Sequence, residues 1–198
     1  MCVRKNPSSG SKVNYSREIL SGVPVTASVT LRHPCAADAT AIESLIAASP
    51  PLDTNSTYCT LLQCTQFAAT CVVAEREGTV AGWISAHVPP SDPQSIFVWQ
   101  VAVASAARGI GLGGRMLDAL VGRPALDGIG RVRTTITEAN QASWQLFESF
   151  ARRHGHVASR AVLFDHDDHF AGRHDTEFEL LIALDGSDRD ASQRKEKS

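Results

Sequence analysis

The chain has no excess of positive charge. Its 198 residues include 19 Lys and Arg against 21 Asp and Glu, which gives a formal net charge of −2. Binding to nucleic acid usually requires a broad basic surface. The charge balance argues against such a surface, and we expect no nucleic-acid partner.

Long apolar runs and paired cysteines are also missing. No run approaches the roughly 20 apolar residues of a membrane span, and Met1–Ser11 lacks the apolar stretch of a signal peptide. The five cysteines contain no Cys-x-x-Cys pair, so neither a disulfide framework nor a zinc ribbon is indicated. We expect a cytoplasmic protein with reduced thiols and no membrane partner.

What the chain does contain is one domain between two polar ends. Residues 1–27 mix Ser, Gly, Lys and Asn with scattered apolar positions, and residues 185–198 are almost wholly polar. Such segments have too little apolar surface to pack. We predict mobile tails at 1–27 and 185–198 around a single domain at 28–184, which is long enough to bury a core.

The first half of the domain is predicted to be antiparallel. Apolar spacing alternates between strand and helix patterns, and a Glu77-Gly78-Thr79 turn signal joins two strands as a hairpin. The predicted elements are a strand at 29–32, a helix around Ile42, Leu45 and Ile46, a helix with Tyr58, Leu61 and Leu62 that Asn55 or Ser56 caps, and strands at 70–76 and 80–88.

The second half predicts a strand–helix–strand–helix unit. Ser95–Val103 is continuously apolar, which predicts a central strand buried on both faces. The following elements are a helix with Met116, Leu117, Leu120 and Val121, a strand at 131–137, a helix at 141–154 ended by Gly155, and strands around 161–164 and 178–184. Together the two halves predict a mixed α/β fold of the α+β type.

A glycine-rich turn, Arg108 to Gly114, lies between the central strand and a helix. Glycines let backbone amides approach an anion closely, and a helix N-terminus adds the positive end of its dipole, so this turn suits a pyrophosphate. Gly109, Gly111 and Gly114 also satisfy the dinucleotide fingerprint G-x-G-x-x-G. An antiparallel set precedes the turn here, whereas that fingerprint normally follows the first strand of its unit. A purely structural turn is the third alternative.

The arrangement resembles the GCN5-related N-acetyltransferase family over about residues 28–184. The family signature Q/R-x-x-G-x-G/A is met by Arg108, Gly111 and Gly113, and residues 140–147 are similar to the family segment N-x-x-A-x-x-L-Y. The resemblance implies a central, mostly antiparallel sheet, flanked by helices and splayed where acetyl-CoA enters. It implies cofactor contacts at Val101, Val103, Arg108, Gly109, Gly111, Leu112, Gly113 and Asn140.

The chain departs from the family at Phe147. Many members carry a tyrosine there that can protonate the leaving thiolate, and phenylalanine has no proton to donate. Water or another side chain would have to serve as the general acid.

Four less common stretches narrow the likeness to the L-2,4-diaminobutyrate acetyltransferases of ectoine biosynthesis. They are residues 50–58, 97–103, 134–137 and 169–177. This resemblance implies acetyl transfer from acetyl-CoA to the C4 amine of L-2,4-diaminobutyrate, giving N4-acetyl-L-2,4-diaminobutyrate, in a homodimer that serves osmoadaptation.

An amine acceptor arrives protonated, because its pKa lies near that of lysine, about 10.4. The site therefore needs anionic groups, and Asp53 in the proline-stiffened loop is a candidate, although it could serve as a turn residue or helix cap. Asn55 of the same loop is a second substrate-binding candidate. A tryptophan on a central strand usually packs in the hydrophobic core. The family resemblance instead favours a Trp99 indole that packs on the ammonium group or the methylene chain of the substrate.

The segment Asp165–Glu177 is dense in His and Asp, which invites a metal-site interpretation. It contains no helical ligand pair such as H-E-x-x-H, so we expect no metal. We interpret His174 and Glu177 as the acid–base pair of the acceptor pocket and Arg173 as a clamp for the substrate carboxylate. Which of His174 and Glu177 takes the proton is left open.

Cys59 and Cys64 raise the alternative of an acyl-cysteine intermediate. Nothing beside them in sequence would lower a thiol pKa, so we predict direct attack of the amine through a tetrahedral intermediate. Three other functions remain alternatives. They are acetylation of another small diamine or a protein N-terminus, non-catalytic binding of acetyl-CoA, and metal-dependent regulation through the His/Asp segment.

Overall fold

The computed structural model describes residues 28–184, and both predicted tails lie outside the described residues. Within this range seven strands form one sheet. The strands are β1 (Val29–Arg32), β2 (Val72–Arg76), β3 (Thr79–His87), β4 (Ser95–Val103), β5 (Arg131–Thr137), β6 (Val157–Phe164) and β7 (Glu177–Ala183). The α-helices are α1 (Ala39–Ala47), α2 (Thr57–Thr65), α3 (Leu112–Val121) and α4 (Gln141–His154).

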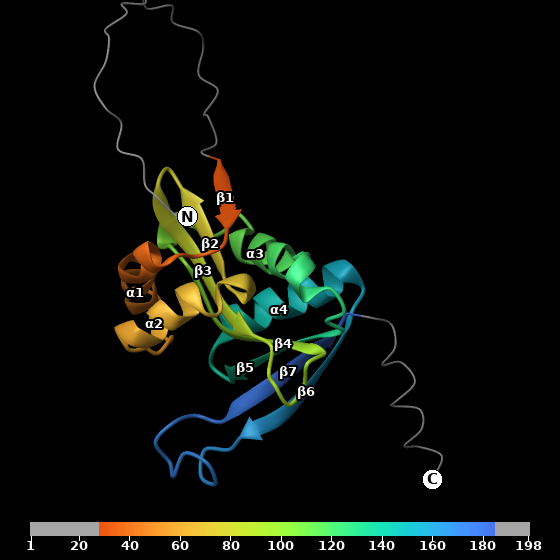
Figure 1. Ribbon diagram of the computed structural model, residues 1–198. Helices are drawn as coiled ribbons and strands as arrows, with labels where there is room; N and C mark the ends of the chain where they lie inside the picture. The colour runs from red at the N-terminus through yellow and green to blue at the C-terminus, as the bar shows by residue number, and fades with distance from the viewer. Residues whose placement is uncertain (1–27, 185–198) are drawn as a thin grey trace, which may run out of the picture.

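The sheet runs in the order β1-β2-β3-β4-β5-β7-β6. Every neighbouring pair is antiparallel except β4 and β5, which are parallel. Helices α1 and α2 lie on one side of the twisted sheet and α3 and α4 on the other (Figure 1). The predicted mixed α/β fold is confirmed. No helix within residues 28–184 is long and apolar enough to cross a membrane.

Capping residues set several of these boundaries. Ser56 precedes α2, and its hydroxyl accepts a hydrogen bond from the Cys59 amide at 3.2 Å, as predicted for a serine cap. Gly155 ends α4 with a φ of 66°, in the left-handed region that favours glycine. The start of α2 and the end of α4 therefore follow from residues visible in the sequence.

The sheet opens between its two central strands. Strands β4 and β5 pair only from Ser95 opposite Arg131 to Phe97 opposite Arg133. Beyond Phe97, β4 continues beside β3, and β5 continues beside β7. The β5-facing backbone edge of β4 therefore has no strand partner over its second half, which confirms the predicted splay.

A β-bulge on β4 changes the direction of its side chains. Gln100 pairs with Ser85 and Val98 pairs with Ala86, so Trp99 is an extra residue on β4. The prediction that this strand is buried on both faces is wrong. Trp99 is 50% exposed and Val101 is only partly buried, because this part of the strand borders open cavities.

Candidate active site

Two adjoining cavities lie at the opening of the sheet. The first, which we call the loop cleft, has a volume of about 340 Å³ and follows the glycine-rich turn. The second, which we call the acidic pocket, has a volume of about 560 Å³. Pro51, Leu52 and Asn140 line both cavities, so a ligand in one can meet a ligand in the other.

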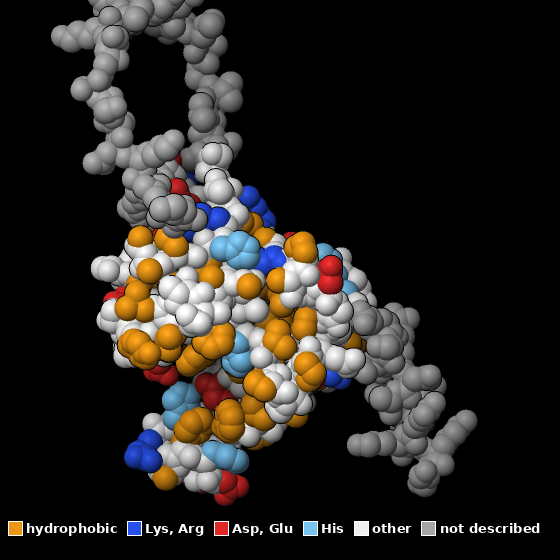
Figure 2. Space-filling view, viewed as in Figure 1, with side chains coloured by type: hydrophobic (Ala, Val, Ile, Leu, Met, Phe, Trp, Pro, Cys, Tyr) orange, Lys and Arg blue, Asp and Glu red, His pale blue; other side chains and the backbone are white. Residues whose placement is uncertain are grey.

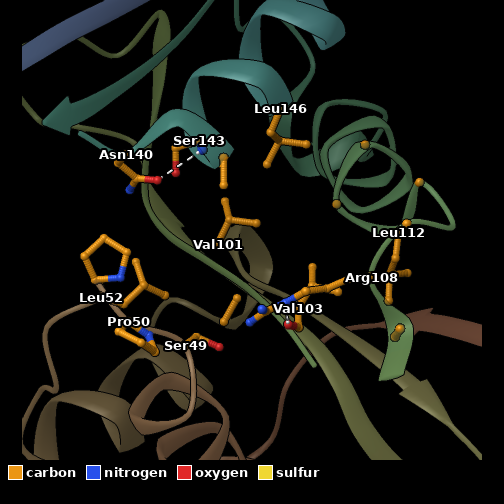
Figure 3. Close-up of a pocket in the computed structure, with 18 residues that line it drawn as sticks. Ser49, Pro50, Leu52, Val101, Val103, Arg108, Leu112, Asn140, Ser143 and Leu146 are labelled. Atoms are coloured by element: carbon orange, nitrogen blue, oxygen red, sulfur yellow. Dashed lines mark hydrogen bonds between the residues drawn. The ribbon is translucent and has the colours of Figure 1, made fainter. Parts of the chain in front are cut away.

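Three parts of the chain surround the loop cleft, as the close-up shows (Figure 3). The chain after α1 forms one side, the end of β4 and the turn before α3 form the base, and the start of α4 forms the opposite side. The labelled residues are Ser49, Pro50, Leu52, Val101, Val103, Arg108, Leu112, Asn140, Ser143 and Leu146.

The glycine-rich turn is shaped to present backbone amides. Gly109 and Gly111 have φ values of 78° and 73°, and no atom lies within 4 Å of the position that a Cβ would take at either residue. Gly111 is the N-cap of α3, so the turn also stands at the positive end of a helix dipole. An open turn of this kind fits a pyrophosphate.

Gly113 has an additional packing role. A Cβ at this position would lie 3.1 Å from Cδ1 of Leu146 on α4. Because Gly113 has no side chain, α3 and α4 can pack closely beside the loop cleft. Gly113 and Leu112 also line this cleft. Arg108 is held at the cleft by a hydrogen bond of 3.0 Å from its Nε to the carbonyl of Val103.

Asn140 stands where the two cavities join. Its Oδ1 accepts a hydrogen bond from the Ser143 amide at 3.2 Å and so caps α4 (Figure 3). That bond uses the acceptor of the side-chain amide and leaves its Nδ2 donors for a ligand. The predicted contact of Asn140 with a ligand is compatible with this position.

The acidic pocket brings together Asp53, His174 and Glu177, which come from distant parts of the sequence. His174 Nε2 lies 4.0 Å from Asp53 Oδ2 and 3.9 Å from Glu177 Oε1. His174 Nδ1 lies 2.8 Å from the carbonyl oxygen of Asp175. Because a carbonyl can only accept, Nδ1 donates to it, and this bond turns Nε2 toward the two carboxylates.

Glu177 is the carboxyl group whose environment is most unusual. Its side chain is 19% exposed, and within the described residues its Oε2 is buried without a hydrogen-bond partner. Burial raises the pKa of Glu177 above the ordinary 4.5, and the neighbouring His174 opposes that rise. A carboxylate in this condition gains from taking a proton, which is what a general base requires.

The other predicted acceptor residues also line the acidic pocket. Trp99 lines it from the bulge of β4, while Asn55 and Arg173 border it from two different loops. Arg173 Nε donates to the Phe170 carbonyl at 3.3 Å. Figure 2 shows a hollow between the helical body and the β6–β7 end of the molecule, with acidic and histidine side chains beside it.

Gln100 is the main site residue that the sequence reasoning missed. It lines the acidic pocket, and its Nε2 donates to the Asp53 carbonyl at 2.7 Å. Its one signal in the sequence is a long polar side chain within an otherwise apolar strand, which by itself does not indicate a partner.

Phe147, Cys59 and Cys64 lie away from the two cavities. Phe147 is 2% exposed and packs in the core shared by α3, α4 and the sheet. Burial raises the pKa of the Cys64 thiol to about 12, and Cys59 lines a separate small cavity beneath α2. Within residues 28–184, no three His, Cys, Asp or Glu side chains are grouped so that they could hold a metal ion.

Comparison with known proteins identifies the family. Residues 40–151 match the model of the acetyltransferase (GNAT) family. The chain belongs to this family. As a member of it, the chain is an acetyl-CoA-dependent acyltransferase.

Curated relatives of this acetyltransferase carry a more specific name. The chain is 46% identical to the L-2,4-diaminobutyric acid acetyltransferase of Vibrio parahaemolyticus, over 77% of this chain and 84% of that protein. It is 40% identical to the enzyme of the same name from Halomonas elongata, over 74% of this chain and 77% of the relative. These likenesses confirm the narrower resemblance seen in the sequence.

A solved structure extends the likeness to three dimensions. The diaminobutyrate acetyltransferase of Paenibacillus lautus, in complex with its substrate L-2,4-diaminobutyric acid and coenzyme A, superposes with a TM-score of 0.76. The two sequences are 36% identical, and the match covers 80% of this acetyltransferase and 96% of that chain.

Proposed function

We propose that this acetyltransferase transfers the acetyl group of acetyl-CoA to the C4 amine of L-2,4-diaminobutyrate, giving N4-acetyl-L-2,4-diaminobutyrate. The observation that carries the proposal is the acidic pocket, which joins the loop cleft and sets Asp53 and Glu177 on either side of His174. The named relatives support the same acceptor. We assign the reaction to ectoine biosynthesis on that resemblance.

The loop cleft is the proposed binding site for acetyl-CoA. The amides around Gly109, Gly111 and Leu112 suit the pyrophosphate, with Arg108 beside them. The unpaired edge of β4 at Val101 and Val103 offers hydrogen-bonding groups to the pantetheine arm. This arrangement directs the thioester toward the junction with the acidic pocket.

The acidic pocket matches the charges of a diamino acid. The substrate carries two ammonium groups and one carboxylate. Asp53 and Glu177 supply negative charge for the ammonium groups, and Arg173 supplies a guanidinium for the carboxylate. Trp99 offers an aromatic face to the ammonium or the methylene chain, and Asn55 offers a side-chain amide.

Proton removal falls to Glu177, with His174 as its partner. The C4 ammonium gives a proton to the Glu177 carboxylate, and the neutral amine then attacks the thioester carbonyl through a tetrahedral intermediate. The new C–N bond forms and the C–S bond breaks. The attacking nitrogen, which carries two protons after the attack, releases one of them to solvent as the amide forms, and the coenzyme A thiolate takes a proton from solvent because Phe147 cannot supply one.

Direct transfer, without an acetyl-enzyme, is the proposed course. The raised pKa of Cys64 keeps that thiol protonated near neutral pH. Incubation with acetyl-CoA alone should leave the intact mass of the protein unchanged. A stoichiometric acetyl adduct that acetylates added amine would overturn direct transfer.

We also propose that the enzyme acts in the cytoplasm as a homodimer, on the strength of the family resemblance. Light scattering should give about twice the 21.2 kDa mass of one chain. A monomer mass across the working concentration range would overturn the dimer proposal.

An acceptor panel tests the function. Thiol release from acetyl-CoA is measured with L-2,4-diaminobutyrate, ornithine, lysine and a peptide with a free N-terminus. We expect the highest kcat/KM with diaminobutyrate. A preference for another diamine or for the peptide would mean that diaminobutyrate is not the acceptor. Binding of acetyl-CoA without turnover of any amine would favour a non-catalytic module.

A further inference from the structure

Gln100 lies beneath a loop that serves both cavities. The loop, residues 49–55, follows α1, and we call it the acceptor loop. Its first residues line the loop cleft, and Asp53 and Asn55 line the acidic pocket. Gln100 comes from β4 immediately after the bulged Trp99, and only 5% of it is exposed.

Two hydrogen bonds join the Gln100 amide to the acceptor loop. Nε2 donates to the carbonyl of Asp53 at 2.7 Å, and Oε1 accepts from Nδ2 of Asn55 at 3.1 Å. A backbone carbonyl can only accept, so the orientation of the Gln100 amide is fixed, and that of the Asn55 amide follows from it.

These contacts hold the part of the loop that carries the carboxylate. Within residues 28–184, no backbone–backbone hydrogen bond involves residues 53–55. The Asp53 side chain is 88% exposed, so its own packing does little to fix it. The position of the Asp53 backbone, from which the carboxylate reaches to 4.0 Å from His174, therefore depends on the Gln100 amide.

We propose that Gln100 is a positioning residue that sets the length of the accepted diamino acid. By holding Asp53 against the sheet, it fixes the distance between the ammonium-binding carboxylate and the thioester end of the cleft. We expect a short 2,4-diamino acid to be accepted at that distance and a longer chain such as ornithine to be accepted less well. This inference rests on the proposed function.

The decisive variant is Gln100→Met, which keeps the size of the side chain and removes both hydrogen bonds. Its matched control is Gln63→Met in α2, an equally buried glutamine with no hydrogen bond to the acceptor loop. Steady-state constants are measured for diaminobutyrate, ornithine and acetyl-CoA, and folding is checked by thermal denaturation.

We expect Gln100→Met to raise the KM for diaminobutyrate about tenfold, with kcat and the KM for acetyl-CoA changed less than about threefold. The kcat/KM ratio of diaminobutyrate to ornithine should fall at least about fivefold. Gln63→Met should keep the wild-type ratio. Asn55→Ala, a change in the loop itself, should move the same constants in the same direction and add little to Gln100→Met.

Unchanged KM and selectivity in folded Gln100→Met and Asn55→Ala would overturn the inference. So would an equal loss for both amines that came from kcat alone, because that pattern marks general damage. If Gln100→Met does not fold, Gln100→Leu, which also removes both hydrogen bonds, decides. Wild-type enzyme that fails to acetylate diaminobutyrate would instead remove the proposed function, which distinguishes the two failures.

Discussion

Glu177 is the residue at which stability and chemistry are opposed. Its folded-state pKa is raised by burial, so its contribution to stability is fully present below the unfolded pKa near 4.5 and is lost as pH rises through the folded value. At neutral pH the ionised form is therefore a cost to folding. That cost supplies the affinity for a proton that the proposed reaction uses.

The variant Glu177→Gln should separate the two effects. We expect kcat to fall about 100-fold or more, because a general base is lost. The acidic limb of the kcat/KM profile, which in the wild type rises as pH passes upward through the raised Glu177 pKa, should disappear. At pH 7 the melting temperature should be equal to or above that of the wild type.

A pH–rate series and thermal denaturation of both proteins provide the readouts. Retention of the acidic limb in Glu177→Gln would assign the base to His174. A clearly lower melting temperature at pH 7 would contradict the stated cost of the ionised carboxylate.

Asp53 is expected to affect binding of the amine substrate, and neither binding of acetyl-CoA nor stability. Its carboxylate is exposed and approaches His174 only at 4.0 Å, so little folding energy depends on it. Asp53→Asn should raise the KM for diaminobutyrate about tenfold or more by removing the charge that faces an ammonium. The KM for acetyl-CoA and the melting temperature should stay close to the wild-type values.

The matched control is Asp127→Asn, an exposed aspartate that lines neither cavity. Steady-state kinetics with each substrate varied in turn provide the measurement. Equal effects of the two variants on the KM for diaminobutyrate would remove Asp53 from substrate binding.

Among the elements, the sequence predicted best where local signals agree. The bounds of β5 and α4 were predicted residue for residue, because their apolar spacing is regular and Gly155 marks the end of α4. The first four residues of β6, from Val157, were missed. This edge strand is exposed along nearly all its length and so has no buried face to produce alternation.

The burial of β4 and the role of Gln100 could not be read from local sequence. A β-bulge leaves no mark in an apolar strand, and the splay depends on where β5 parts from β4. The hydrogen bonds of Gln100 join it to a loop far away in the chain. The predicted site residues could be named because family-like motifs carried them, whereas their distances required the fold.

The turn before α3 permits a matched test of the role of its amides. Gly111 and Gly128 have φ values of 73° and 88°, and at both positions the space for a Cβ is empty. Replacement by alanine should therefore cost each protein a similar stability, about 1 kcal/mol. Only Gly111→Ala should raise the KM for acetyl-CoA, by about tenfold, because only Gly111 lines the loop cleft.

Kinetics and thermal denaturation of the two alanine variants check this expectation. Equal melting temperatures together with equal KM values for acetyl-CoA would contradict the assignment of the turn to the pyrophosphate.

At the scale of the whole molecule, the splay of one sheet brings both cavities to a single junction. Strands β4 and β5, which separate beyond Phe97, form the sides of this junction. The free edge of β4 lines the loop cleft, and the end of β5 lines the acidic pocket. The acceptor loop crosses between them and carries residues of both cavities. The proposed acetyl transfer takes place at this shared junction.

The position of the acetyl group on the product tests this account most directly. The enzyme is supplied with L-2,4-diaminobutyrate and acetyl-CoA that carries carbon-13 at the acetyl carbonyl, and the product is examined by long-range carbon–proton NMR correlation. We predict a correlation from the labelled carbonyl to the C4 methylene protons. A correlation to the C2 proton, or the absence of a labelled diaminobutyrate product, would contradict the account.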